Sequence, residues 1–310
     1  MGRRDRVYRR GRRRYGREKR FRWKSGVIAA AVGVALVAGG VCTWYFLRQA
    51  PQQAPQAVSS VVESSAVTSA ETSERVGSTP EHPYQTLYPE MYVPKTEKIG
   101  ATAGEKTVYL TFNNAPGLQT EQILQVLEQQ NVQATFFVYC NEQSEENLRS
   151  MIAQMAEKGH TVGVLTDTAD YARMYASVEN YLEDFHRVFA LITEATGEKP
   201  AVFRFAGGSV NGYNRGTIKE IAAEMTRRGF TYHDWSLDSA DTVAGATGER
   251  VYQTVVDGIL NSGKSVVLLD NNAGVTLEQL PAIIAKAKEN GYRFQALNAT
   301  TKPFTMAMPD

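Results

Sequence analysis

The sequence predicts an α/β domain, a distorted (β/α) barrel of about seven parallel strands, preceded by one transmembrane helix. Short apolar runs alternate with longer amphipathic segments through the C-terminal two thirds of the chain, as they do when helices connect parallel strands. Some runs, such as SVVLLD at 265–270, are almost wholly apolar, which is typical of strands buried on both faces. The membrane helix is predicted by an uncharged apolar stretch near the N-terminus.

Residues 1–25 form a strongly basic N-terminal tail. The first 24 residues hold 13 Lys or Arg against Asp5 and Glu18, so the tail carries about +11. Because the whole chain carries +1, the remaining residues carry about −10. We expect the tail to set membrane orientation and to attract anionic headgroups. Nucleic-acid binding is the weaker alternative, and no nucleic-acid partner is predicted.

Residues 26–47 read GVIAAAVGVALVAGGVCTWYFL, long enough to cross a hydrocarbon layer of about 30 Å as a helix. The run is too long for a typical signal-peptide core, and the tail before it is unusually long. We therefore prefer an uncleaved anchor to a cleaved signal peptide. The basic residues predict a cytoplasmic N-terminus, so the chain is expected to be a single-pass cell-membrane protein with an extracellular domain.

Residues 48–83 are predicted to form a flexible linker, because they are rich in small and polar residues and almost lack large apolar ones. The domain is assigned to 84–300, and a C-terminal tail to 301–310. The chain has two cysteines, Cys42 in the anchor and Cys140 in the domain. No disulfide can therefore form within the exported domain, and its own core must stabilise it.

The elements of the domain follow from the alternation of apolar runs and helical patterns. Strands are expected at 107–112, 133–138, 161–165, 201–205, 231–237, 265–270 and 292–297. Helices are expected at 119–130, 145–158, 177–196, 214–228, 248–262 and 276–290. Right-handed crossovers would place these helices outside the sheet. An open doubly wound sheet is the alternative, but no Gly-rich dinucleotide or phosphate loop supports it.

Five motifs occur in order along the domain. They are VYLTFNNAP at 108–116, GHTVGVLTDTA at 159–169, VFRFAGGS at 202–209, DWSLDSAD at 234–241 and VVLLD at 266–270. Together they resemble the NodB-homology domain of the polysaccharide deacetylases, the family-four carbohydrate esterases. The resemblance runs from about residue 84 to 300. It implies a barrel-like hydrolase that uses a divalent metal such as zinc to remove acetyl groups from cell-wall or chitin-like glycans.

The residues that carry the chemistry in that family are replaced in this chain. The resemblance implies that Asn113 stands where the family has its general base, and Leu269 where it has its general acid. The three metal-ligand positions of the family hold Asn114, Leu165 and Ala169. An asparagine cannot take a proton from water, and leucine and alanine offer zinc no lone pair. We therefore predict no metal, no cofactor and no intact catalytic residue.

Other family positions are retained, and in active relatives they orient and tune the base and the acid. The retained residues are Arg204, Asp238, Asp241 and Asp270, with Trp235 beside them. We favour a structural role in which Arg204 pairs with one of the three aspartates and ties strand ends together. In the alternative, the groove binds a sugar or peptide, and the candidate ligand-binding residues are then Asn113, Asn114, Arg204, Trp235 and Asp270.

Asp167 and Asp170 could form a substitute metal site, because their carboxylates suit a hard cation. A solvated loop is the preferred interpretation of these two residues.

Taken together, the motifs predict a membrane-anchored extracellular pseudoenzyme that binds cell-wall glycan or a wall-associated protein. An active N-deacetylase with a non-standard site is the first alternative, and a protein-binding regulator is the second. The sequence leaves open whether the chain is an enzyme.

Overall fold

The structure, a computed structural model, describes residues 82–99, 105–140 and 143–308. All of the described residues belong to one compact unit. Within them, no helix combines the length and the apolar character that a membrane crossing requires. The basic tail and the anchor predicted at 26–47 lie outside the described residues, as does nearly all of the predicted linker.

The described residues form one sheet of eight strands. The strands are β1 (Thr107–Ala115), β2 (Thr135–Tyr139), β3 (Thr161–Thr166), β4 (Val202–Phe203), β5 (Thr231–Tyr232), β6 (Leu237–Asp238), β7 (Lys264–Asp270) and β8 (Arg293–Phe294). Their order is β5-β4-β3-β2-β1-β7-β6, with β8 paired to β1. Each pairing is parallel, which confirms the predicted parallel α/β fold.

The prediction of a single strand at 231–237 was wrong, because this segment forms two short strands. Its start, β5, pairs with β4, and its end, β6, pairs with β7. Between them the backbone changes partner: the His233 N–H donates to Phe203 O, and the Ser236 N–H donates to Val266 O. Since β5 and β6 stand at opposite ends of the sheet order, the barrel is open along this seam. The fold is a half-barrel whose two edges are joined by the chain itself.

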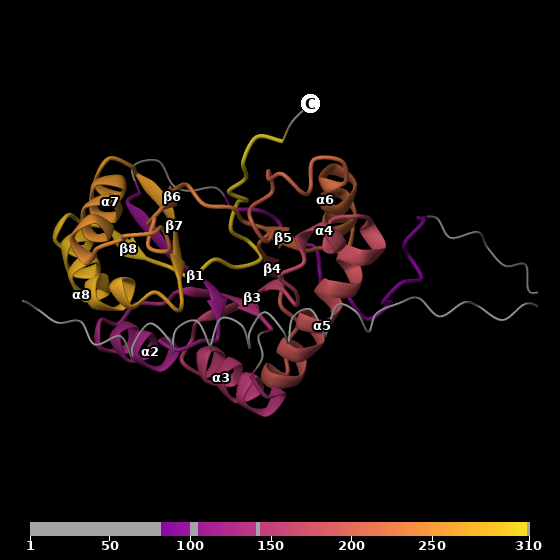
Figure 1. Ribbon diagram of the computed structural model, residues 1–310, viewed down its shortest axis with the longest axis horizontal. Helices are drawn as coiled ribbons and strands as arrows, with labels where there is room; N and C mark the ends of the chain where they lie inside the picture. Colours follow the sequence, from indigo (N-terminus) through magenta and orange to yellow (C-terminus); the bar gives the residue numbers. More distant parts are fainter. Residues whose placement is uncertain (1–81, 100–104, 141–142, 309–310) are drawn as a thin grey trace, which may run out of the picture. The chain divides into compact units, whose positions relative to one another are not determined.

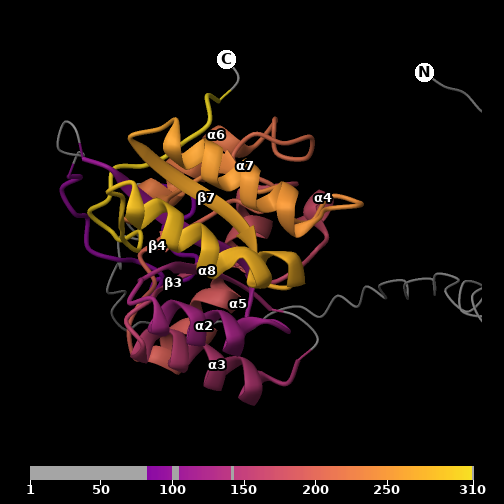
Figure 2. The same cartoon turned by 90° about the vertical axis from the view of Figure 1, so that its left-hand side faces the viewer.

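The predicted helices are present, each within four residues of the expected ends. They are α2 (Thr120–Gln129), α3 (Glu145–Glu157), α5 (Val178–Thr196), α6 (Ile218–Arg227), α7 (Gly248–Leu260) and α8 (Gly274–Glu289), with one short unpredicted helix, α4 (Tyr171–Met174). Ser144, Ser177 and Thr247 begin three of them by accepting a backbone N–H of the first turn. Figure 1 shows the helices around the strands, with α7 and α8 on one side and α5 and α6 on the other; Figure 2 shows α7, β7 and α8 from that first side.

The segment before β1 is bound to α6 by a buried arginine. The side chain of Arg228 is fully buried, and its Nε donates to Glu224 Oε1 at 2.6 Å. Its other nitrogens donate to four backbone oxygens at 2.8–3.4 Å, those of Tyr84, Leu87, Tyr88 and Met91. One guanidinium thus satisfies four carbonyls of residues 84–91, which lack regular secondary structure, and this segment is part of the domain.

The described part of the predicted C-terminal tail, residues 301–308, lies along the seam between β5 and β6, and we call it the strap. The Asp234 N–H donates to Phe304 O at 2.7 Å, and the Met306 N–H donates to Asp234 Oδ2 at 2.8 Å. Phe304, Met306 and Met308 are partly buried while the residues between them are exposed, as along a strand. In Figure 1 the strap rises between β6 and β5 toward the C-terminus.

Candidate functional site

The carboxyl ends of the strands meet at a groove made of two adjoining cavities. The central cavity, of about 220 Å³, is lined by these residues of the predicted site: Asn113, Asn114, Leu165, Trp235, Asp238, Asp241, Leu269 and Asp270. The side cavity, of about 420 Å³, is lined by Asn114 and Ala169. Tyr171 of α4, which was not predicted, lines both cavities. In parallel α/β folds this end of the strands is the usual place for a binding site.

Arg204, the remaining predicted residue, lies beneath the groove and is fully buried. It follows β4 and donates from Nη1 to Asn113 Oδ1 at 2.9 Å. Its other donors reach the backbone oxygens of His233 at 2.9 Å and Asp234 at 3.0 Å. Its guanidinium also lies 4.3 Å from the ring centroid of Phe137. Arg204 thus joins the end of β1 to the segment that crosses the seam.

The predicted ion pair between Arg204 and one of the retained aspartates was wrong. Within the described residues, Arg204 has no carboxylate oxygen within 4.0 Å, because its donors are used by Asn113 and by the two backbone carbonyls. Burial lowers the pKa of Arg204 to about 9, and the nearby charge of Asp234 opposes this shift. The guanidinium is therefore a buried cation held mainly by neutral oxygens.

Asn114 faces the same cavity as Asn113 although the two are neighbours on a strand. Its φ of +57° breaks the alternation of side chains, at the point where the register between β1 and β2 shifts. Its Nδ2 donates to Asp270 Oδ2 at 2.6 Å, and the Asn272 N–H holds Asp270 Oδ1 at 2.8 Å. The second amide of the motif is therefore bound by the carboxylate that β7 delivers.

The other two aspartates are held by backbone and hydroxyl donors rather than by cations. Asp241 Oδ2 accepts the Asp270 N–H at 2.8 Å and the Thr276 hydroxyl at 2.5 Å. Burial raises the pKa of Asp241, and these hydrogen bonds offset part of the rise. Asp238, at the end of β6, is exposed and accepts the Ala240 N–H at 2.8 Å.

Asn114, Leu165 and Ala169, which stand at the metal-ligand positions implied by the family resemblance, do not offer a donor set for a metal. Leu165 and Ala169 supply hydrocarbon, and Asn114 is engaged with Asp270. Across the described residues, no group of three His, Cys, Asp or Glu side chains lies close enough to hold an ion. The donor set therefore does not fit zinc, which needs at least three protein ligands in a catalytic site.

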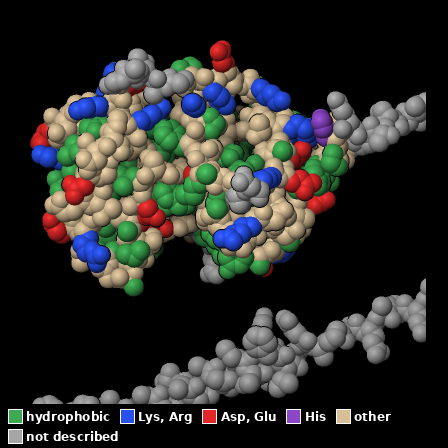
Figure 3. Space-filling model, turned by 90° about the horizontal axis from the view of Figure 1, so that it is seen from above, with side chains coloured by type: hydrophobic (Ala, Val, Ile, Leu, Met, Phe, Trp, Pro, Cys, Tyr) green, Lys and Arg blue, Asp and Glu red, His purple; other side chains and the backbone are tan. Residues whose placement is uncertain are grey.

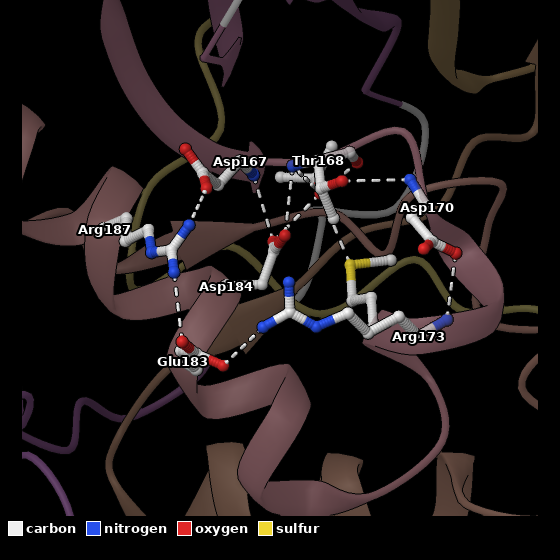
Figure 4. A network of polar contacts seen from close by, with 9 residues as sticks. Asp167, Thr168, Asp170, Arg173, Glu183, Asp184 and Arg187 are labelled. Atoms are coloured by element: carbon white, nitrogen blue, oxygen red, sulfur yellow. Dashed lines mark hydrogen bonds and ion pairs between the residues drawn. The ribbon is translucent and has the colours of Figure 1, made fainter. Parts of the chain in front are cut away.

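Asp167 and Asp170, the alternative metal candidates, have different partners. Asp167 pairs with Arg187 at 2.8 Å, and Asp170 caps α4 by accepting the Arg173 N–H at 3.1 Å (Figure 4). Figure 4 also shows Asp184, a buried residue of α5 that sequence reasoning missed. It accepts the Thr166 hydroxyl and two backbone N–H groups, and so holds the loop after β3. The sequence signal that could have identified Asp184 is its position as an acidic residue on the apolar face of α5.

Apolar and aromatic groups complete the groove. Leu165 and Leu269 are almost fully buried in the floor of the central cavity, and Trp235 and Tyr171 are partly exposed at its sides. Tyr213 is 61% exposed, and its ring stands edge-on to that of Tyr171 with centroids 5.9 Å apart. The groove thus offers both ring faces and hydrogen-bonding groups to a ligand. Figure 3 shows the face of the molecule seen from above, on which hydrophobic side chains lie between charged ones.

Comparison with known proteins gives a consistent result. The model of the polysaccharide deacetylase family matches residues 100–228. The putative polysaccharide deacetylase YheN of Bacillus subtilis (strain 168) is 28% identical over 205 residues, 64% of this chain and 70% of YheN. The crystal structure of the catalytic domain of peptidoglycan N-acetylglucosamine deacetylase from Eubacterium rectale is 29% identical with a TM-score of 0.65, and the match covers 70% of this chain and 98% of that one.

A third comparison shows similarity of the fold alone. The crystal structure of a mutant of BA3943, a CE4 family pseudoenzyme with restored enzymatic activity, is 21% identical to this chain with a TM-score of 0.52. The match covers 65% of this chain and 70% of that one.

Proposed function

We propose, since the chain belongs to the polysaccharide deacetylase family, that its domain binds a cell-wall glycan in the groove without hydrolysing it. One observation carries the proposal: the base, the three metal ligands and the acid of the family are replaced, at Asn113, Asn114, Leu165, Ala169 and Leu269, while the groove around them remains.

The contacts of the two asparagines support the loss of hydrolysis. A deacetylase must activate water and stabilise a developing oxyanion, and the family does both with a metal and a base. Asn113 has no basic lone pair for the proton, and its oxygen is already bound by Arg204. Asn114 donates to Asp270 instead of binding an ion. Each asparagine is thus engaged with a neighbouring charged side chain, Asn113 with Arg204 and Asn114 with Asp270.

The glycan is proposed from the relatives and from the shape of the groove. The similar Eubacterium rectale protein has peptidoglycan N-acetylglucosamine as its named substrate. Trp235 and Tyr171 provide ring faces on which a sugar can stack, and the aspartates and asparagines provide hydrogen bonds to hydroxyl groups. BA3943 shows that the family includes a pseudoenzyme, so loss of activity is compatible with this fold.

The proposal is tested by two assays on the same purified chain. We expect binding of acetylated glycan oligomers by calorimetry, and no release of acetate when zinc, cobalt or manganese is supplied. Acetate release that depends on added metal, above a denatured control, would instead establish an active deacetylase with a non-standard site.

A protein-binding regulator is the second candidate, and exposed apolar residues favour it. Leu118, which lines the side cavity, is 84% exposed, and Tyr213, whose ring contacts that of Tyr171, is 61% exposed. Insoluble peptidoglycan that fails to retain the chain, together with capture of one wall-associated protein lost on Leu118→Ser, would favour this candidate.

We further propose that the domain is held outside the cell by the apolar run at 26–47. Support comes from the basic residues that precede the run and from the wall substrate named for the similar protein. Protease added to cells whose wall has been opened should digest residues 84–310 and spare the N-terminal tail. Protection of the domain in intact protoplasts would contradict this topology.

A further inference from the structure

We propose that Asn113 and Asn114 form an amide-recognition pair, which selects the acetamido group of a glycan over the free amine of the same glycan. The inference rests on the proposed function, because it assigns the chemistry by which the same groove recognises its ligand. It differs from the family reaction in that the two replaced side chains themselves make the contacts, with no metal.

The orientation of both amides follows from their partners. Arg204 can only donate hydrogen bonds, so the Asn113 atom 2.9 Å from its Nη1 must be the oxygen. An ionised Asp270 can only accept, so the Asn114 atom 2.6 Å from its Oδ2 must be the nitrogen. The usual ambiguity between oxygen and nitrogen in an asparagine is therefore removed at both positions.

The remaining polar atoms of the pair are one donor and one acceptor. Asn113 Nδ2 and Asn114 Oδ1 have no hydrogen-bond partner among the described residues, and neither is a buried atom. Both side chains line the central cavity. A secondary amide presents the complementary set, a C=O that accepts from Asn113 and an N–H that donates to Asn114.

The floor of the cavity suits the methyl end of the same group. Leu165 is 4% exposed, and Leu269 and Ala206 are each 1% exposed, and all three line the central cavity beside the asparagines. A free amine lacks both the methyl and the carbonyl, and an ammonium group can only donate. It would therefore leave Asn113 Nδ2 without an acceptor and the apolar floor without contact. The carboxylates of Asp238 and Asp241 attract the ammonium group of the free amine. The measured ratio of the two affinities therefore reports whether the amide contacts outweigh this attraction.

The experiment compares two ligands on the full chain solubilised in mild detergent. Tetramers of N-acetylglucosamine and of glucosamine are titrated by calorimetry at pH 7 and moderate salt. We expect the acetylated tetramer to bind at least tenfold more tightly. Asn113→Asp replaces the free N–H donor by a carboxylate. This variant should therefore bind the acetylated tetramer roughly tenfold more weakly and the amine tetramer more tightly. Asn147→Asp makes the same change on exposed α3, outside both cavities, and should leave the preference as it is.

Each outcome decides the matter. Equal affinities, or tighter binding of the amine tetramer, would overturn the inference while leaving glycan binding in place. An acetylated preference that Asn113→Asp does not change would assign the selectivity to other residues and would also overturn it. Binding of neither tetramer would refute the proposed function together with the inference. The Asn113→Asp variant is expected to fold, because the new carboxylate would face the Arg204 guanidinium. Circular dichroism checks this.

Discussion

Asn113 and Asn114 are adjacent amides with opposite electrostatic surroundings. Asn113 presents its oxygen to a buried guanidinium, whereas Asn114 presents its nitrogen to the Asp270 carboxylate. The same substitution to aspartate should therefore have different consequences at the two positions. An aspartate at 113 would gain a charge partner, and an aspartate at 114 would replace a hydrogen bond by two facing carboxylates.

We predict that Asn114→Asp lowers the free energy of unfolding by about 2–4 kcal/mol at pH 7, from the lost hydrogen bond and the repulsion between carboxylates. The loss should shrink as the pH falls to 4, because the two carboxylates can then share a proton. Asn113→Asp is the matched control and should cost little or stabilise the domain. Urea unfolding at both pH values measures this, and equal losses for the two variants would contradict the electrostatic account.

Two buried histidines are predicted to make the fold sensitive to acid. His160 accepts the Ala134 N–H on Nδ1 at 3.2 Å, and burial lowers its pKa to about 4. His233 is fully buried, and burial, together with the charge of Arg204, lowers its pKa to about 3. Both are therefore neutral in the folded domain at pH values where the unfolded chain already binds protons.

The sign of the pH effect follows from these lowered pKa values. Above about pH 6.5 both states are neutral and the stability is complete; below it the unfolded chain gains a proton, at about 1.4 kcal/mol per pH unit and histidine. Between pH 6.5 and 5 each histidine should therefore remove about 2 kcal/mol. Urea unfolding should show that the double variant His160→Gln and His233→Gln loses less stability over this interval than the unsubstituted domain. Parallel curves would contradict the prediction.

At the scale of elements, the strap compensates for the break between β5 and β6. The His233 N–H still donates to Phe203 of β4, but Asp234 crosses the seam without a strand partner. Phe304 O accepts the Asp234 N–H, and the Met306 N–H donates to the Asp234 carboxylate. The Phe304 ring lies 5.8 Å from that of Tyr109, between centroids. Asp234 also accepts two hydrogen bonds from Ser209, so the strap is connected to the loop that borders the groove.

We predict that Phe304→Ala lowers the free energy of unfolding by about 1.5–3 kcal/mol, less than a fully buried phenylalanine would, because Phe304 is only partly buried. Thr305→Ala, next to it and exposed, should change stability by less than about 0.5 kcal/mol. Chemical denaturation of both variants tests the role of the strap. A loss for Phe304→Ala no greater than that for Thr305→Ala would show that the strap does not stabilise the seam.

At the scale of the whole molecule, we expect the groove to bind a metal once metal-binding side chains stand at the three ligand positions that the family resemblance implies. Asn114 lines both cavities, the central one with Leu165 and the adjoining side cavity with Ala169. We predict that the variant with Asn114→Asp, Leu165→His and Ala169→His together binds zinc, whereas Asn114→Asp alone does not.

Zinc binding is measured by equilibrium dialysis and by the rise in melting temperature with added metal. Even the triple variant should hydrolyse slowly, because Asn113 and Leu269 still occupy the positions that the resemblance implies for the base and the acid, each worth about 10²–10⁴-fold. Chelator should leave the melting temperature of the unsubstituted domain unchanged. Zinc affinity equal in the triple and single variants would show that the three positions do not converge.

The sequence by itself determined the parallel α/β class and the six main helices, and it predicted which family positions are substituted. These features are local: apolar runs and helical periodicity depend on neighbouring residues, and the motifs are read in order along the chain. It also predicted that Asn113, Asn114, Trp235 and Asp270 would share the groove, because the carboxyl ends of parallel strands meet at one edge of the sheet, but Arg204, predicted with them, is buried beneath it.

Only the tertiary structure decided which groups pair. The predicted partner of Arg204 was an aspartate, but packing places Asn113 and two backbone carbonyls around its guanidinium. The split of 231–237 also depends on distant strands, since β4 pairs with its start and β7 with its end. The role of the strap depends on the same seam. Such contacts join residues far apart in the chain, and neither hydrophobic pattern nor propensity contains the distances that select one partner over another.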